Sequence, residues 1–237
     1  MIRIAHIADS HFDERHRLED NVRVHQAFLE QAAAADVDLI VHSGDVYERK
    51  STPAERNVAI SFFQRCANIA PVVIVRGNHD APGDLLVFEK VLCRYGIRVF
   101  ERPAVERIRT KDDVPVCLIA LPWFDRGWLA AQTGDTDQEA VRTKTIAAAE
   151  ELLHTLRAQA SEHGLPTVLV GHVQVQGSEV SSGQTLVGST VELTPAAIRE
   201  VGAQYAALGH IHKHQHWNDG VVCYAGSPQR HNFGEAE

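Results

Sequence analysis

Five short apolar runs in this chain each lead directly into a motif of histidine, aspartate or asparagine residues. The runs read IRIAHIA, VDLIVHS, APVVIVR, TVLV and QYAAL. The motifs that follow them are Asp9-Ser10-His11, Gly44-Asp45, Gly77-Asn78-His79-Asp80, Gly171-His172 and Gly209-His210-Ile211-His212. Short aliphatic runs of this kind predict buried strands. Because ligands bind beyond the carboxyl ends of parallel strands, we expect the five motifs to meet at one point.

Strands and helices alternate along the chain, which predicts an α/β fold with a largely parallel sheet flanked by helices. The predicted strands cover residues 2–8, 39–42, 72–75, 116–121, 167–170, 205–208 and 221–224. The predicted helices cover residues 22–35, 53–67, 85–95, 138–163 and 195–201. The longest predicted loops, 122–137 and 173–190, are expected to form functional rims.

Length and composition narrow the class of protein. The 237 residues fit one domain, 1–237, and 44% hydrophobic residues suffice for a sizeable core. No stretch reaches the ~20 apolar residues of a membrane span, and the N-terminus lacks the order of a signal peptide. The scattered cysteines Cys66, Cys93, Cys117 and Cys223 are expected to be buried free thiols. These features predict a cytoplasmic protein without a membrane segment.

The net charge bears on the partner. A formal charge of −8 argues against a nucleic-acid partner. Two bound divalent ions would, however, add four positive charges at the centre of the site. Arginine supplies most of the 23 basic residues and suits bidentate contact with phosphate. The net charge therefore argues against the hypothesis that DNA is the partner but does not exclude it.

The first two motifs supply carboxylates and an imidazole. Asp9 and His11 are two residues apart just past a strand, so both side chains can point to one side and bind the same ion. Gly44 permits a close backbone approach, and both oxygens of Asp45 can bridge two ions. Taken alone, the first pair could be a solvated loop, and Asp45 could cap the following helix.

The third motif is the most specific. Asn78 offers a neutral oxygen to a metal ion, His79 could donate a proton, and Asp80 could orient His79 from behind by a hydrogen bond. An ordinary turn rarely carries these residues directly after a run such as VVIVR.

The last two motifs add His172, His210 and His212, the latter two again two residues apart at a strand exit. Together with the earlier motifs they give seven ligands, Asp9, His11, Asp45, Asn78, His172, His210 and His212. With Asp45 shared, each of two ions receives four. Oxygen and nitrogen ligands without thiolate favour manganese, with iron, zinc and magnesium as alternatives. Two ions ~3.5–4 Å apart suit in-line displacement at phosphorus by a bridging water.

The order of these motifs resembles that of the calcineurin-like metallophosphoesterase superfamily, which reads D-x-H, G-D, G-N-H-D/E, G-H and G-H-x-H. The resemblance spans essentially the whole chain and implies a four-layer αββα sandwich with two central sheets. It implies that Asp9, His11, Asp45 and His212 hold one ion and that Asp45, Asn78, His172 and His210 hold the other. It also implies that His79 is the catalytic histidine.

Within this superfamily the chain is most similar to SbcD-type DNA exonuclease subunits. The segments RIAHIADSHF, VGHVQVQGSEVSSG and ALGHIHKHQHWNDGVVCYAGSPQRHNFGEAE carry that similarity. It implies DNA as substrate, a role in DNA repair, an SbcC-type ATPase partner and a homodimer formed through the early helices. Arg230 and His231 in the last segment could face phosphate or form a solvated turn.

Two departures limit what the similarity implies. Some nucleases of this type carry histidine three positions after the shared aspartate, where this chain has Glu48. The C-terminal cap domain usual in the family is expected to be absent here.

The rival hypotheses are a small-molecule or cyclic-nucleotide phosphodiesterase of the same superfamily, a protein phosphatase, and a non-catalytic metal-stabilised scaffold. GDVYERK and GNHD differ from the phosphatase motifs G-D-x-V-D-R-G and G-N-H-E. A scaffold would be expected to lack some of the ligands.

Overall fold

A four-stranded, all-parallel sheet forms the first half of the molecule. The computed structural model describes residues 1–124, 138–181, 184, 191–217 and 220–230. The sheet runs in the order β1 (Ile4–Ile7), β2 (Leu39–His42), β3 (Val72–Val75) and β4 (Ile97–Phe100). Helix α1 (Leu18–Ala34) joins β1 to β2, and α2 (Pro53–Ile69) joins β2 to β3. Because each connection is a crossover, all four carboxyl ends reach the same edge.

A six-stranded sheet forms the second half. Its strands are β5 (Ala104–Arg109), β6 (Pro115–Leu121), β7 (Thr167–His172), β10 (Tyr205–Gly209), β11 (Gln215–Trp217) and β12 (Val222–Tyr224), in the order β11-β12-β10-β7-β6-β5. The four central strands are parallel, whereas β5 and β11 pair antiparallel at the two edges. Helix α4 (Gln138–His163) precedes β7, α5 (Pro195–Glu200) precedes β10, and β8 (Gln174–Val175) pairs with β9 (Glu192–Leu193).

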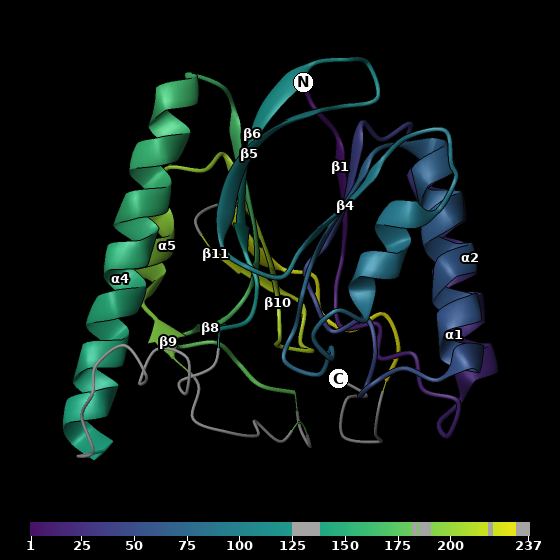
Figure 1. Cartoon of the computed structure of the whole chain (residues 1–237), viewed down its shortest axis with the longest axis horizontal. Coiled ribbons are helices and arrows are strands. Elements are labelled where there is room, and N and C mark those ends of the chain that lie inside the picture. The colour runs from purple at the N-terminus through teal and green to yellow at the C-terminus, as the bar shows by residue number, and fades with distance from the viewer. Residues whose placement is uncertain (125–137, 182–183, 185–190, 218–219, 231–237) are drawn as a thin grey trace.

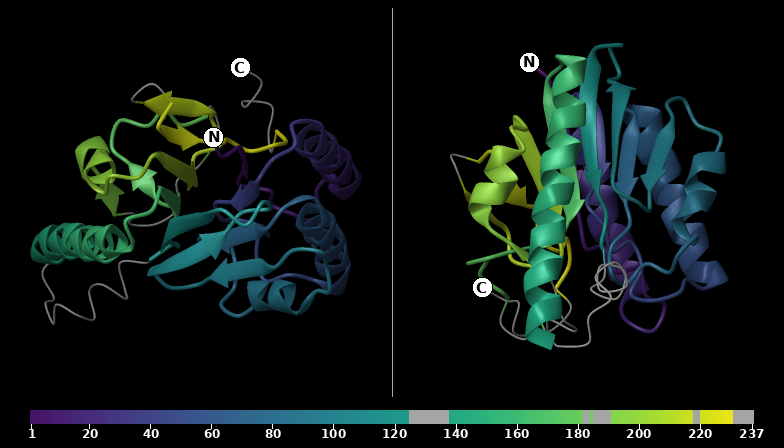
Figure 2. Two further views of the ribbon diagram at one scale, coloured as in Figure 1. Left: turned by 90° about the horizontal axis from the view of Figure 1, so that it is seen from above. Right: turned by 60° about the vertical axis from the view of Figure 1, so that its left-hand side comes forward.

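The two sheets pack face to face between two layers of helices (Figures 1 and 2). Helices α1 and α2 cover the first sheet, and α4 and α5 cover the second. Neighbouring residues of β2 show how both faces of a sheet are buried: Ile40 packs under the helices, while Leu39 and Val41 face the other sheet. This arrangement is the four-layer αββα sandwich that the resemblance implies.

Local sequence signals explain most helix boundaries. Thr52 caps α2, accepting a hydrogen bond from the Glu55 backbone N–H, while the Glu55 carboxylate accepts one from the Thr52 backbone. Pro53 occupies the first turn, where a backbone N–H would have no partner within the helix. Within the described residues, none of the helices is apolar over enough of its length to cross a bilayer. All four cysteines are free thiols, of which Cys66 and Cys117 are buried.

The segment predicted as a helix over residues 85–95 is different in the structure. It forms a 3₁₀ helix, η1 (Leu85–Lys90), after which Val91 is extended and Leu92 is exposed. The apolar spacing that suggests a longer helix therefore serves only two turns of 3₁₀ helix. The predicted strands also lack β4, β5, β8, β9 and β11. These are edge strands or short strands in which apolar residues alternate with charged or polar ones.

Candidate metal centre

The expected ligands reach one edge of the sandwich from both sheets. Asp9 and His11 follow β1, Asp45 follows β2, and Asn78 follows β3. His172 is the last residue of β7. His210 and His212 follow β10. The two sheets thus contribute their carboxyl ends to the same place, as the motif pattern predicts.

The glycines of three motifs allow the loops of the two sheets to interpenetrate. A Cβ atom at Gly44 would lie 2.3 Å from Nδ1 of His172, and one at Gly77 would lie 2.1 Å from an oxygen of Asp45. A Cβ atom at Gly209 would lie 2.2 Å from the Ser43 carbonyl oxygen. Any larger residue would push the ligands apart, so the glycines are needed to form the site.

Four ligand atoms crowd around one point on the His172 side. The Asn78 oxygen Oδ1 lies 2.9 Å from Nε2 of His172 and 3.0 Å from Nδ1 of His210. Nε2 of His172 is also 3.2 Å from Oδ2 of Asp45. Two ligands that each bind an ion at about 2.1 Å and at a right angle are ~3 Å apart. The spacing therefore fits a divalent ion.

The hydrogen bond behind His172 fixes which nitrogen faces this point. Its Nδ1 lies 2.7 Å from the Ser43 carbonyl oxygen, which can only accept, so Nδ1 carries the proton. In the neutral ring, Nε2 then presents a lone pair to the oxygens of Asn78 and Asp45. Such a cluster of acceptors needs either an extra proton or a cation, and Ser43 serves as the partner that orients a metal-binding imidazole.

A second group lies on the His11 side. The ligand atoms of Asp9, His11 and His212 all lie within 4.8 Å of one another. Nε2 of His11 is 3.8 Å from Oδ2 of Asp45, which also faces His172. Asp45 thus lies between the two groups, where one carboxylate can serve both ions.

Backbone strain is concentrated at these ligands. Among the described residues, seven non-glycine residues have a positive φ, and four of them are expected ligands. These are Asp9, His11, Asp45 and His210, with φ of 52°, 43°, 55° and 102°. Strain of this kind costs about 1–3 kcal/mol at each residue and persists where function requires the geometry.

Burial makes the charges of the site costly without an ion. Asp9, Asp45 and His172 are 0%, 2% and 0% exposed. Burial raises the pKa of Asp9. Burial also opposes protonation of His172, but the Asp45 carboxylate outweighs it and raises the pKa of His172 to about 9. Without an ion, His172 therefore carries an extra proton. That proton lies among donor atoms whose chemistry fits a divalent cation.

His79 lies at the rim, with its side chain 32% exposed. Its backbone N–H donates to Oδ1 of Asp45 at 2.9 Å, and its Nδ1 lies 2.8 Å from the Glu48 carbonyl oxygen. Since that carbonyl can only accept, Nδ1 carries a proton. Nε2 is then the nitrogen available for proton exchange with a substrate.

Asp80 contacts other groups than the sequence suggests. Its carboxylate accepts hydrogen bonds from the backbone N–H of Tyr47 at 3.0 Å and of Gly77 at 2.9 Å, whereas the His79 ring pairs with Glu48. Burial, together with the charge of Asp45, raises the pKa of Asp80 to about 6. Asp80 therefore joins the two loops that carry Asp45 and Asn78 and does not hold the His79 ring.

Three residues at the site were not identified as functional from the sequence. The Glu48 carboxylate lies 2.8 Å from Nδ1 of His11. The Trp123 ring lies 5.0 Å from the His210 ring. Gln184 donates to the His210 carbonyl oxygen and accepts from the His212 backbone N–H. Trp123 follows β6, so the rule that located the motifs at strand ends could have found it.

The terminal turn also reaches the site. The Ser227 hydroxyl lies 3.0 Å from the Asp9 carbonyl oxygen and 2.7 Å from that of Gln229, and its one proton can be donated to either. Arg230 is exposed, and His231 lies outside the described residues, as does the rest of the last segment.

A buried network holds the loop between Asp9 and His11. Nδ1 of His25 lies 2.8 Å from the Asn21 carbonyl oxygen, so its Nε2 accepts from the Ser10 hydroxyl at 2.8 Å. The same hydroxyl then accepts from Nε2 of His42 at 2.8 Å. Burial lowers the pKa of His25 to about 4 and that of His42 well below its usual value, so both rings stay neutral. These two histidines support the site but are not ligands.

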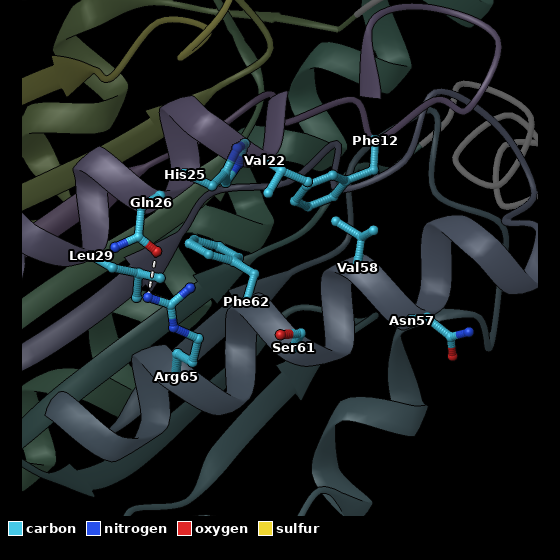
Figure 3. Close-up of a pocket in the computed structure, with 10 residues that line it drawn as sticks. All are labelled: Phe12, Val22, His25, Gln26, Leu29, Asn57, Val58, Ser61, Phe62 and Arg65. Carbon is cyan, nitrogen blue, oxygen red and sulfur yellow. Dashed lines mark hydrogen bonds between the residues drawn. The ribbon is translucent and has the colours of Figure 1, made fainter. Parts of the chain in front are cut away.

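The other side of His25 lines a pocket of about 260 Å³ between α1 and α2 (Figure 3). Phe12 and Phe62 form its apolar wall, and Gln26 and Arg65 are hydrogen-bonded at its rim. The pocket lies on the helix side of the Ser10 loop, apart from the expected ligands.

We expect Gly77→Ala to displace the Asp45 carboxylate, because the new methyl group would overlap it. The variant should lose most of its Mn²⁺ binding, measured by calorimetry, while its circular dichroism spectrum is retained. Gly96→Ala is the matched control, since a Cβ atom there meets nothing within 4 Å. Equal metal binding by Gly77→Ala and the parent protein would show that this close approach is not needed.

Metal binding should tighten as the pH rises from about 7 to about 9. Burial opposes protonation of His11 and His172, but nearby carboxylates, Glu48 and Asp45 foremost, raise the pKa of each ring to about 9. Both rings are protonated at neutral pH in the ion-free protein, so ion binding must displace those protons. Calorimetry in two buffers of different ionisation enthalpy measures their release. Binding without proton release contradicts this expectation.

Comparison with known proteins supports the fold and the motif order. Residues 2–214 match the family model of the calcineurin-like phosphoesterases. The SbcD subunit of the SbcCD nuclease of Rhodobacter capsulatus is 26% identical over an alignment of 251 residues, which covers 96% of this chain and 62% of the relative. The equivalent SbcD protein of Staphylococcus epidermidis is 25% identical over 249 residues, covering 99% and 63%. The chain thus spans less than two thirds of the length of these relatives.

Solved structures agree in fold. GAP50 of Plasmodium has a TM-score of 0.57 at 14% identity, covering 96% of this chain and 72% of its own. TT1561 of Thermus thermophilus has a TM-score of 0.57 at 12% identity, covering 96% and 91%. A dimetal phosphatase from Danio rerio has a TM-score of 0.54 at 11% identity, covering 96% and 88%. Since the family match covers nearly the whole chain, the protein belongs to the calcineurin-like phosphoesterases, a family of metal-dependent hydrolases with a dimetal centre.

Proposed function

We propose that this protein is a dimetal phosphodiesterase and that its substrate is DNA, as in an SbcD-type nuclease of DNA repair. The observation that carries the first part is the convergence of carboxylate, amide and imidazole ligands from both sheets around Asp45. The similarity to two SbcD proteins along almost the whole chain supports the second part.

The grouping of the ligand atoms supports two ion sites that share Asp45. Asp9, His11, Asp45 and His212 would hold one, and Asp45, Asn78, His172 and His210 the other. When bound, the two ions supply charge neutralisation at the phosphate and a water of lowered pKa. Manganese is the ion we propose, because the donors are oxygen and nitrogen without thiolate.

His79 is placed to handle the proton of the leaving group. Its Nδ1–H is held by the Glu48 carbonyl oxygen, and its backbone N–H is held by Asp45, so the ring has a fixed direction next to the ligands. Nε2 can then donate a proton to the leaving oxygen or stabilise its charge. The ring centres of His79 and His11 lie 5.0 Å apart, which supports a proton donor close to the proposed ion held by His11.

The proposed partners follow the relatives. An SbcC-type ATPase is the proposed protein partner, and residues 1–237 are the proposed catalytic domain. We also propose a homodimer formed by the face of α1 and α2, where Val22 is 43% exposed beside the pocket of Figure 3. Sedimentation velocity of the parent and of Val22→Glu tests this: a monomeric parent would contradict the dimer.

The catalytic assignment predicts different losses at two residues. Asp45→Asn should lose metal binding and hydrolysis together, because both ion sites share this carboxylate. His79→Gln should keep two ions per chain and lose roughly 10²- to 10⁴-fold in rate, since only the proton transfer is removed. His154→Gln, an exposed position on α4, is the control. Parent-like cleavage of DNA by His79→Gln would show that the assigned role is wrong.

The substrate is tested with end-labelled linear and hairpin DNA beside bis-p-nitrophenyl phosphate, in the presence of manganese. Cleavage of both supports the nuclease. Activity on the small ester alone favours a small-molecule or cyclic-nucleotide phosphodiesterase. Fewer than two ions per chain and no activity on either ester favour a metal-stabilised scaffold.

A further inference from the structure

Glu48 places a carboxylate at the rim of the candidate centre. Its Oε2 lies 2.8 Å from Nδ1 of His11, and its Oε1 lies 3.7 Å from Nδ1 of His79. The side chain is 42% exposed, whereas those of His11 and Asp45 are 3% exposed. The proposed mechanism uses the backbone carbonyl of Glu48 to orient His79, and the carboxylate contacts His11 but is given no role toward the substrate.

The charge of this carboxylate persists when the centre is loaded. A histidine bound to a metal ion is a neutral ring, and the proton on its other nitrogen faces its supporting partner. His11 can therefore donate to Glu48 without neutralising it. The adjacent cation, Arg49, lies 2.8 Å from Asp13 and 3.2 Å from Glu55. Whatever else contacts Glu48, its replacement by glutamine removes one negative charge from this rim.

A negative charge beside His79 repels phosphomonoesters more strongly than phosphodiesters. A phosphodiester carries one negative charge at neutral pH, and a phosphomonoester carries nearly two, because its second pKa is ≈ 6. Both kinds of ester would bind to the same two ions. The position of the phosphate group therefore does not distinguish them. The carboxylate repels the dianion about twice as strongly as the monoanion.

We propose that Glu48 is a specificity-determining residue that disfavours phosphomonoesters and so restricts the centre to phosphodiesters. This inference rests on the proposed phosphodiesterase function. It gives the substrate class a physical cause in this chain, namely a fixed charge that repels the more highly charged ester. It also applies to the product, because hydrolysis of a diester leaves a monoester that the same carboxylate repels.

The expected size of the effect is modest. The Glu48 side chain is 42% exposed, so solvent screens its interaction with a bound phosphate. Removal of its charge should shift the preference between the two esters by roughly three- to tenfold, and salt should reduce the shift.

The test compares Glu48→Gln, Glu48→His and Glu48→Asp with the parent, and Glu151→Gln, an exposed position on α4, is the control. The kcat/KM ratio for p-nitrophenyl phosphate over bis-p-nitrophenyl phosphate should rise roughly three- to tenfold in both uncharged variants and stay unchanged in Glu48→Asp. Calorimetry with inorganic phosphate and dimethyl phosphate, at a verified metal content, should show the same shift in affinity without turnover.

The outcomes separate this inference from the proposed function. If the parent hydrolyses neither ester, the proposed function fails, and the two phosphate affinities still test Glu48. If the parent hydrolyses the diester and the ratio is unmoved in both uncharged variants, the inference about Glu48 is overturned. An equal rise in Glu48→Asp would also overturn it, because the cause would then be shape and not charge.

Discussion

The Asp45 carboxylate lies where the loops of the two sheets interpenetrate, 3.2 Å from Nε2 of His172 and 2.9 Å from the backbone nitrogen of His79. This contact is available only because Gly44, Gly77 and Gly209 leave no side chain between the loops. Burial makes the contact costly unless cations balance it. The sandwich therefore does two things at once: it buries three apolar layers, and it forces a shared carboxylate against imidazoles from the opposite sheet.

The sequence predicts the interior of this fold better than its edges. The bounds of β2, β3 and α4 agree with the predicted ranges, because buried parallel strands are aliphatic runs and because Gly164 and Pro166 end the long helix. Edge strands such as β5 alternate charged and apolar residues over a short span, and η1 uses helical spacing for only two turns of 3₁₀ helix. Their structure depends on packing partners that the local pattern does not contain.

The same distinction applies to the site. The motif residues that follow strands could be gathered from sequence, because topology alone brings carboxyl ends together. The contacts of Glu48, Gln184 and Asp80 could not, because each depends on which loop of one strand meets the loop of another. Motif order thus predicts which side chains are expected at the metal centre. The three-dimensional structure shows which backbone carbonyls and amides orient those side chains.

The site joins parts of the chain that are synthesised far apart in time. The backbone nitrogen of His210 donates to the carboxylate of Asp9, 201 residues earlier, and the Ser227 hydroxyl lies 3.0 Å from the Asp9 carbonyl oxygen, 218 residues earlier. During synthesis, Asp9 lacks its His210 partner until β10 has been made and its Ser227 partner until β12 has been made. A chain that ends before β10 therefore lacks His210 and His212 and could not complete the expected set of metal ligands.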